Sequence, residues 1–414
     1  MRRRARRDGA DSRAHALSAR PDAPRPRRYA DLPFAAVSFG YFAYAGLFGT
    51  YAPLWFQSLG YTTFAIGALT SMQSATRLVA PYAWGWIADH TGLRERLLRI
   101  AVAGALVSSA GFFFGTDYRW MAAVSVTLFV CTAGIIPISE SLLAYRVSRD
   151  GKLDVARYGR VRMWGSVGFI VAVTASGFVL EAAGVRSFPV LVSLLLAGLL
   201  VAASRLPPAN EKAHTEEAAI GAFAVLRQPV VAWFFGGVFL TVLGHTSLYA
   251  FYSLYLASLG YDKGTIGLLW AVGVAVELGW FFFQGRWTHL LPMHAWLLVA
   301  ALASAFRFGA IAAFGDVAAV LVAAQCLHAL SFAAQHSACI AVISRHFPGR
   351  LRGRGQALYA VLGYGFSGVI GGVAGGALSE ALGFAAVFWA GSAAAVLAAG
   401  CCWQAMRLER RAPP

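Results

Sequence analysis

Long apolar stretches, separated by shorter polar ones, run along the chain from residue 32 almost to its end. An α-helix rises 1.5 Å per residue, so about 20 apolar residues cross the roughly 30 Å hydrocarbon core of a bilayer. The pattern predicts twelve such helices, over residues 32–56, 64–87, 97–115, 120–145, 163–181, 187–205, 230–256, 264–285, 293–314, 317–343, 357–379 and 384–405. We therefore expect an all-α membrane protein with twelve transmembrane helices.

A segment that joins two of these helices recurs 200 positions later in the sequence. Ser58-Leu59-Gly60-Tyr61 returns as Ser258-Leu259-Gly260-Tyr261, and Ile66-Gly67, Leu69 and Gly85 return as Ile266-Gly267, Leu269 and Gly285. Each copy occupies the same place in a set of six predicted helices. Parallel repeats of six helices around a binding site at the bilayer midplane are known from secondary transporters.

The repeat predicts two pseudo-symmetric six-helix bundles, over residues 32–205 and 230–406. A polar stretch, 206–229, separates them as a cytoplasmic linker. Residues 1–31 are basic and poor in apolar side chains, which indicates a disordered cytoplasmic tail. Residues 407–414 form a second, short cytoplasmic tail.

Charged residues make up 13% of the chain, about half of their share in an average soluble protein. The net charge is +16, and most arginines lie in the N-terminal tail and in alternate loops, at 94–99, 146–162, 345–354 and 407–411. The other loops hold only Arg119, Arg186 and Lys263. This asymmetry places both termini in the cytoplasm. We expect a multi-pass protein of a bacterial inner membrane whose partner is the lipid bilayer and not nucleic acid.

The chain shows no sign of enzyme chemistry. It has no nucleotide-binding P-loop and no zinc-protease histidine motif. Its five cysteines all lie in predicted membrane helices without the spacing of metal ligands, so we interpret them as packing residues. We therefore expect neither a cofactor nor a metal ion, and no enzyme activity.

The repeat differs in charge at one matched position, where Arg77 of the first copy corresponds to Glu277 of the second. Both residues lie midway along predicted membrane helices. A charge at the centre of such a helix costs about 2.5–3.5 kcal/mol on insertion scales, so it usually serves a function. We expect Arg77 and Glu277 to face each other across the axis that relates the two halves.

Polar residues inside the predicted membrane helices recur at the spacing of one helix face. Such stripes are Thr70, Gln73, Ser74 and Arg77; Gln325, His328, Phe332 and Gln335 or His336; and Tyr41, Tyr44, Phe48, Tyr51 and Trp55. A polar face in a membrane bundle points to the protein interior or to a water-filled cavity. We expect a cavity for the first two stripes, whereas packing remains an equal alternative for the aromatic one.

The loop after the second predicted helix reads GWIADHTGLRER over residues 85–96. Its Gly85, Asp89, Gly92 and Arg94 resemble the cytoplasmic signature of the major facilitator superfamily. Gly85 would let two helix ends approach, Gly92 would turn the loop, and Asp89 would accept bonds from an arginine or a helix N-terminus. We interpret the four residues as a conformational latch.

Within that superfamily the chain resembles the 3-phenylpropionate transporter group. YGRVRMWGSVGF (158–169) is similar to the start of that group's fifth helix, and GLLWAVGVAVEL (267–278) to its eighth. Arg77, Arg307, His328 and His336 fall where the group carries the same residue types, and Glu140 falls where it has an acid. The resemblance implies a secondary transporter that works without a cofactor.

The oligosaccharide–proton symporters, typified by lactose permease, are the nearest alternative. Glu277, Arg307 and His328 lie where that family also has Glu, Arg and His, and Arg162 matches an arginine that the permease uses on sugar. The acid one turn after the histidine carries the proton there, but this chain has Ser331. This departure shifts the expected proton role to Glu277 and the histidines.

We expect a monomeric proton symporter for a small organic solute such as an aromatic carboxylate. Arg77 or Arg307 would bind the carboxylate, because a guanidinium presents a planar fork to it. The expected substrate-binding set is completed by Gln73, Tyr41, Tyr44, Tyr252 and Trp270, and the proton-coupling set is Glu277, His328, His336 and Glu140. Glu140 has the alternative of pairing with Arg162. A neutral-sugar or nucleoside symporter and a proton-antiport efflux carrier remain open.

Overall fold

The computed structural model describes residues 31–149, 152–208, 225–348 and 351–411. Most of the predicted tail 1–31, most of the predicted linker and the last three residues lie outside these ranges. Residues Pro33–Pro414 form one compact unit. We call its residues up to 208 the N-terminal half and those from 225 the C-terminal half.

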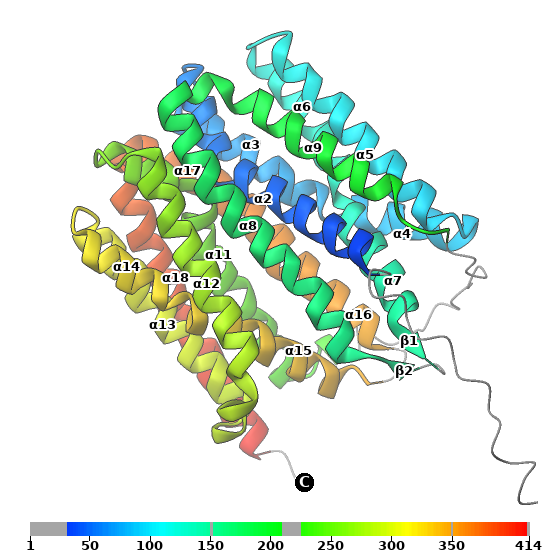
Figure 1. Cartoon of the computed structure of the whole chain (residues 1–414). Helices are drawn as coiled ribbons and strands as arrows, with labels where there is room; N and C mark the ends of the chain where they lie inside the picture. Colours follow the sequence, from blue (N-terminus) through cyan, green and yellow to red (C-terminus); the bar gives the residue numbers. More distant parts are fainter. Residues whose placement is uncertain (1–30, 150–151, 209–224, 349–350, 412–414) are drawn as a thin grey trace, which may run out of the picture. The chain divides into compact units, whose positions relative to one another are not determined.

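The described residues are almost entirely helical (Figure 1). The N-terminal half contains α2 (Leu32–Ser58), α3 (Thr63–Thr76), α4 (Ala80–Thr91), α5 (Arg94–Ala110), α6 (Tyr118–Ala133), α7 (Ile135–Val147), α8 (Val155–Ala183) and α9 (Phe188–Ser204). A hairpin of two short strands, β1 (Ser148–Arg149) and β2 (Lys152–Leu153), precedes α8.

The C-terminal half contains α11 (Pro229–Ser258), α12 (Lys263–Phe283), α13 (Met293–Phe314), α14 (Ala318–Cys326), α15 (Gln335–His346), α16 (Arg352–Leu358), α17 (Ser367–Leu382) and α18 (Phe384–Arg411). Two π-helices, η5 (Ala329–Ala334) and η7 (Tyr359–Phe366), continue α14 into α15 and α16 into α17. The wider turns of a π-helix occur most often at functional sites.

Eleven helical stretches in the described part of the chain are long and apolar enough to cross a membrane. They correspond to eleven of the predicted segments. The segment predicted as one helix over 64–87 is instead divided into α3 and α4. Pro81 explains the break, because in a continuous helix its ring would clash with the carbonyl of Arg77. Arg77 is therefore the C-cap of α3 and does not lie midway along a helix.

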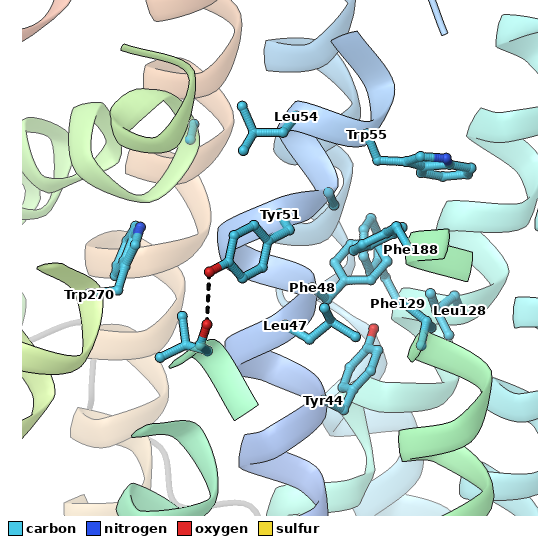
Figure 2. Packing of buried hydrophobic residues seen from close by; sticks show 14 of the residues in the cluster. Tyr44, Leu47, Phe48, Tyr51, Leu54, Trp55, Leu128, Phe129, Phe188 and Trp270 are labelled. Atoms are coloured by element: carbon cyan, nitrogen blue, oxygen red, sulfur yellow. Dashed lines mark hydrogen bonds between the residues drawn. The ribbon is translucent and has the colours of Figure 1, made fainter. Parts of the chain in front are cut away.

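The centre of the N-terminal half is a cluster of buried aromatic side chains on α2 and its neighbours. Tyr44, Phe48 and Trp55 lie along α2 and surround Phe188 of α9 (Figure 2). The ring of Trp55 stacks on that of Phe188 with their centres 5.1 Å apart. This contact shows that Trp55, at the C-terminal end of the predicted aromatic stripe, packs inside its own half.

Two pairs of helices join the halves, α3 against α17 and α8 against α12. Glycines allow both crossings. A Cβ atom at Gly67 would overlap the backbone carbonyl of Gly372, and one at Gly267 would overlap the Tyr51 hydroxyl and the carbonyl of Val173. Gly67 and Gly267 are counterparts in the sequence repeat, so the repeat marks one close approach in each of the two crossings.

Most hydrogen bonds between the described parts of the halves lie at one end of the helices, which we call the closed end. The bond from the Ser71 hydroxyl to the Val369 carbonyl lies further along α3. Glu181 of α8 accepts bonds from the backbone N–H and the ammonium of Lys263, at 3.0 and 2.9 Å. Glu380 of α17 accepts a bond of 3.1 Å from the backbone N–H of Phe64. Each half thus supplies a carboxylate to the N-terminus of a helix in the other half, where the helix dipole favours negative charge.

The start of α12 is further fixed by its own N-cap. Asp262 accepts a 2.9 Å hydrogen bond from the backbone N–H of Thr265 and a 2.6 Å bond from its hydroxyl. These bonds from Thr265 hold the pKa of Asp262 below its usual value. The carboxylate therefore stays ionised at neutral pH and keeps the helix start in place beside Lys263.

We expect the double substitution Glu181→Gln with Glu380→Gln to weaken the closed end without unfolding the protein. Both carboxylates are exposed to solvent. Exposed contacts of this kind contribute little to stability, so we expect only a few-fold shift of the conformational equilibrium. Distances between spin labels at Arg119 and Val317 would measure it. Asp154→Asn is the matched control, because Asp154 caps α8 within its own half and lies away from both labels in the sequence. Identical distance distributions in all three proteins would contradict the expectation.

Candidate functional site

A cavity of about 450 Å³ is lined by residues of both halves. The N-terminal half contributes Tyr41, Phe42, Tyr44, Phe48, Thr70, Gln73, Ser74, Arg77 and Arg162, among others, and the C-terminal half contributes Tyr249, Trp270, Glu277, Gln325, His328, Phe332 and Tyr364. Ligand pockets usually measure roughly 300–1,000 Å³ and combine apolar walls with a few polar groups. The volume and the lining therefore suit one small organic molecule.

The cavity brings together seven of the residues that the sequence predicts for binding and coupling. These are Tyr41, Tyr44, Gln73 and Arg77 from α2 and α3, and Trp270, Glu277 and His328 from α12 and the turn before η5. The whole predicted stripe from Thr70 to Arg77 faces it. Arg77 and Glu277 thus line the same cavity, as their positions in the repeat predict.

Arg307 lies behind the cavity wall and is fully buried. Its guanidinium donates to Gln325 Oε1 at 2.6 Å and to the Ser331 hydroxyl at 3.1 Å, and it lies 2.8 Å from His328 Nδ1. Arg307, which the sequence predicts to bind the substrate, does not line the cavity, whereas its partners Gln325 and His328 do. Arg307 instead orients these two side chains.

Glu277 reaches Arg307 only through His328. The His328 Nε2 atom lies 3.5 Å from Glu277 Oε2, and its Nδ1 atom lies against the Arg307 guanidinium. Because Nδ1 faces a group that can only donate, it must accept, which leaves the proton of a neutral ring on Nε2. His328 is thereby oriented as a donor toward Glu277. A change of charge on the Glu277 carboxylate would alter its contact with His328 and, through the ring, the contact between His328 and Arg307.

A second polar chain starts at Tyr364, which lines the cavity from η7. Its hydroxyl lies 3.2 Å from that of Tyr359, and the Tyr359 hydroxyl lies 3.3 Å from Nδ1 of His336. His336 does not itself line the cavity, and these two tyrosines connect it to the cavity wall. Since η7 supplies both tyrosines, the π-helix determines how they are placed.

Two other predicted residues lie outside the cavity lining. Tyr252 is fully buried behind Trp270, with the two rings at 76° and their centres 5.8 Å apart. Glu140 accepts a 3.0 Å bond from Arg162, which is the alternative that the sequence left open for it. The pairing holds Arg162 at the cavity wall, where its guanidinium also covers the ring of Phe42.

The predicted latch residues lie around the turn between α4 and α5, with Gly85 and Asp89 within α4, Gly92 as its C-cap and Arg94 at the start of α5. Gly92 has φ +67°, a conformation that favours glycine, and Arg94 pairs with Asp89 at 2.6 Å. A Cβ atom at Gly85 would meet no atom of the described residues within 4 Å. Asp89 thus has the predicted arginine partner, whereas the described part of the chain shows no close approach at Gly85.

The sequence did not predict several parts of the cavity wall. Arg162 was considered only as a match to a sugar-binding arginine or as a partner of Glu140, and Tyr249 and Tyr364 were not singled out. The pairing of Glu140 with Arg162 was a usable signal, because an arginine held by a membrane carboxylate lies near the bundle interior. The tyrosines gave no such signal, since η7 breaks the regular spacing that defines a helix face.

The chain is similar in sequence and in fold to known proteins. Residues 32–390 match the model of the MFS_1 like family. A probable 3-phenylpropionic acid transporter of Escherichia coli (strain K12) is 26% identical over 366 residues, covering 85% of this chain and 93% of that protein. A maltose permease of Geobacillus stearothermophilus is 28% identical over 358 residues, covering 84% and 87%. The solved structure of the nucleoside transporter NupG is similar in fold, with a TM-score of 0.80 at 16% identity, over 91% of this chain and 99% of that one.

Proposed function

The chain belongs to the MFS_1 like family of membrane transporters, and we propose that it is a proton-coupled symporter that imports a small aromatic carboxylate similar to 3-phenylpropionate. The family and its relatives are transporters, so the protein is a transporter and not an enzyme. We propose that α3 and α4 together make one crossing, which gives twelve crossings in two bundles. In this proposal the transporter is a monomer of the bacterial inner membrane, and both termini are cytoplasmic.

The observation that carries the proposal is the presence of Arg77 and Glu277 in one cavity. No carboxylate among the described residues forms an ion pair with Arg77. Arg162, the other arginine of the wall, is already paired with Glu140. Arg77 is thus the cation that is available to an anionic substrate, and its planar fork suits a carboxylate.

The aromatic side chains of the cavity suit the ring of such a substrate. Tyr41 and Tyr44 approach from α2, and Trp270 approaches from α12. The ring of Trp270 is held by its Nε1–H, which donates to the Ser253 hydroxyl at 3.1 Å. A ring that stacks on these side chains would place its carboxylate toward Arg77 and away from Glu277, since like charges repel.

Glu277 is the proposed proton carrier. It lines the cavity, and no arginine or lysine among the described residues pairs with it directly. His328 contacts Glu277 on one side and Arg307 on the other, so it would orient the carboxyl group and respond to its charge. Rocking of the two halves would then expose the loaded cavity to each side of the membrane in turn.

Uptake into proteoliposomes tests the proposal. With a pH gradient that is alkaline inside, labelled 3-phenylpropionate should accumulate above its external concentration, and a protonophore should abolish this excess. One coupled proton supports about tenfold accumulation for each pH unit, because both equal about 1.4 kcal/mol. Uptake that is independent of the gradient would contradict proton coupling. Lack of any binding or uptake would contradict the substrate class.

We expect Arg77→Gln to weaken binding of 3-phenylpropionate by about 10- to 100-fold, because it removes a charged hydrogen-bond partner. Binding of the neutral analogue 3-phenylpropanol should change little. Isothermal titration with both ligands measures the difference. Arg286→Gln is the matched control, since Arg286 lies outside the cavity beside Phe283. Equal losses for both ligands would show that Arg77 serves the structure and not the carboxylate.

A neutral sugar is the second candidate substrate. Gln73 and Gln325 add amide groups to the wall, and one relative is named a maltose permease. In this case Arg162 with Glu140 would bind hydroxyl groups, and Arg77 would only balance the charge of Glu277. Competition separates the candidates, because maltose should displace a bound sugar and 3-phenylpropionate should displace a bound aromatic acid.

A further inference from the structure

A cluster of two histidines and one glutamate lies outside the cavity, where three helices of the C-terminal half meet. His294 lies in the first turn of α13, His346 ends α15, and Glu409 lies in the last turn of α18. One ligand atom from each residue lies within 4.8 Å of the others. In the described part of the chain, this is the one group of three His, Cys, Asp or Glu side chains that lie close enough together to hold a metal ion.

The two histidines have ring nitrogens without hydrogen-bond partners. His294 is 1% exposed, and its Nδ1 atom is buried with no partner among the described residues. The same holds for the Nε2 atom of His346. A buried polar atom without a partner costs free energy, and such atoms in native structures call for an explanation such as a bound ion.

The existing contacts are of the kind that a metal ion can replace. His294 Nε2 lies 3.2 Å from Glu409 Oε2, which is an ion pair only if the histidine carries a proton. The other oxygen, Glu409 Oε1, accepts from Arg345. Two imidazoles and one carboxylate form a ligand set that zinc sites use, with a fourth position for water. Ligand atoms that each lie about 2 Å from a zinc ion are at most about 4 Å apart, so the three side chains would move closer together on binding.

We propose that His294, His346 and Glu409 bind one divalent transition-metal ion such as Zn²⁺. The ion takes the place of the proton between His294 and Glu409 and joins the ends of α13, α15 and α18. The sequence predicts no metal ion, because its cysteines lack the spacing of metal ligands and it has no zinc-protease histidine motif. The three residues of this cluster are far apart in the chain. Only the packing of the three helices brings them together.

Titration of the purified, full-length transporter with Zn²⁺ tests the proposal, after any affinity tag with histidines has been removed. We expect one site per chain, and a weakening of at least about tenfold in both His346→Asn and Glu409→Gln. Co²⁺ provides a second readout, because the visible absorption of the bound ion reports its coordination. His289→Asn is the matched control, since His289 is an exposed histidine of the same half.

Arg345→Gln separates a metal site from a simple ion-pair network. Arg345 competes for Glu409 and its side chain is 73% exposed, so its removal should leave the fold intact and strengthen Zn²⁺ binding several-fold. If the cluster serves only as an ion-pair network, Arg345→Gln leaves Zn²⁺ binding unchanged. Binding that is absent in the wild type, or equal in the wild type and both ligand variants, would overturn the proposal. None of these outcomes depends on the identity of the transported substrate.

Discussion

Replacement of Glu277 by glutamine is expected to abolish the accumulation of substrate in a pH gradient while exchange continues. The amide has nearly the same shape as the carboxyl group, but it neither gains nor loses a proton. A pH gradient of two units should therefore drive about hundredfold accumulation in the wild type and none above the external concentration in Glu277→Gln. Labelled substrate in proteoliposomes measures both gradient-driven uptake and exchange across an unenergised membrane.

The neighbours of Glu277 supply the control for this experiment. Ser331 donates nothing to Glu277 but accepts from Arg307 on the far side of His328, so Ser331→Ala should retain coupling. Glu277→Asp keeps a titrating carboxyl group on a shorter side chain and should restore part of the accumulation. Full gradient-driven accumulation by Glu277→Gln would remove Glu277 from the proton pathway.

Substitution of Gly267 by alanine is expected to disfavour the conformation described here, in which the two halves meet at the closed end. The added Cβ would overlap the Tyr51 hydroxyl, which donates to the Val173 carbonyl at 2.8 Å (Figure 2). Overpacking of this kind costs about 1–3 kcal/mol. Because the crossing of α8 and α12 exists only where the halves are closed, the whole cost falls on that state, which predicts a 5- to 150-fold shift of the equilibrium.

Modification of cysteines introduced at the closed end measures that shift. A single cysteine at Ser258 should react faster with a polar maleimide in Gly267→Ala than in the parent protein, and uptake should fall in parallel. Gly279→Ala is the matched control, because Gly279 lies on the same helix and a Cβ there would meet nothing within 4 Å. Equal reactivity in both variants would mean that the crossing tolerates the extra atom.

The apolar pattern was sufficient to predict the helices because each crossing must bury about 20 residues in lipid. Eleven of the twelve predicted segments correspond to stretches that are long and apolar enough. The prediction of the twelfth segment as one continuous helix was wrong, because the ring of Pro81 interrupts the preceding turn and divides the segment into α3 and α4. The count of crossings and the arrangement in two bundles remain predictions.

The sequence predicted the location of the site better than the contacts within it. The repeat aligned Arg77 with Glu277, and both line one cavity. Arg307 showed the limit of this reasoning, because its charge marked it as important but could not show that its partners Gln325 and His328 line the cavity whereas Arg307 does not. That arrangement depends on side-chain packing between α13 and η5, for which no pattern in the sequence is specific.

The contacts at the closed end are exchanged in pairs between the halves. Glu181 and Glu380 lie 199 positions apart, and each binds the start of a helix in the other half. Such reciprocity is the mark of an isologous interface, which two copies of one subunit form around a two-fold axis. The closed end is therefore arranged like an isologous interface within a single polypeptide. A substitution on one side has no symmetric counterpart on the other, so a single variant perturbs only one of the two contacts.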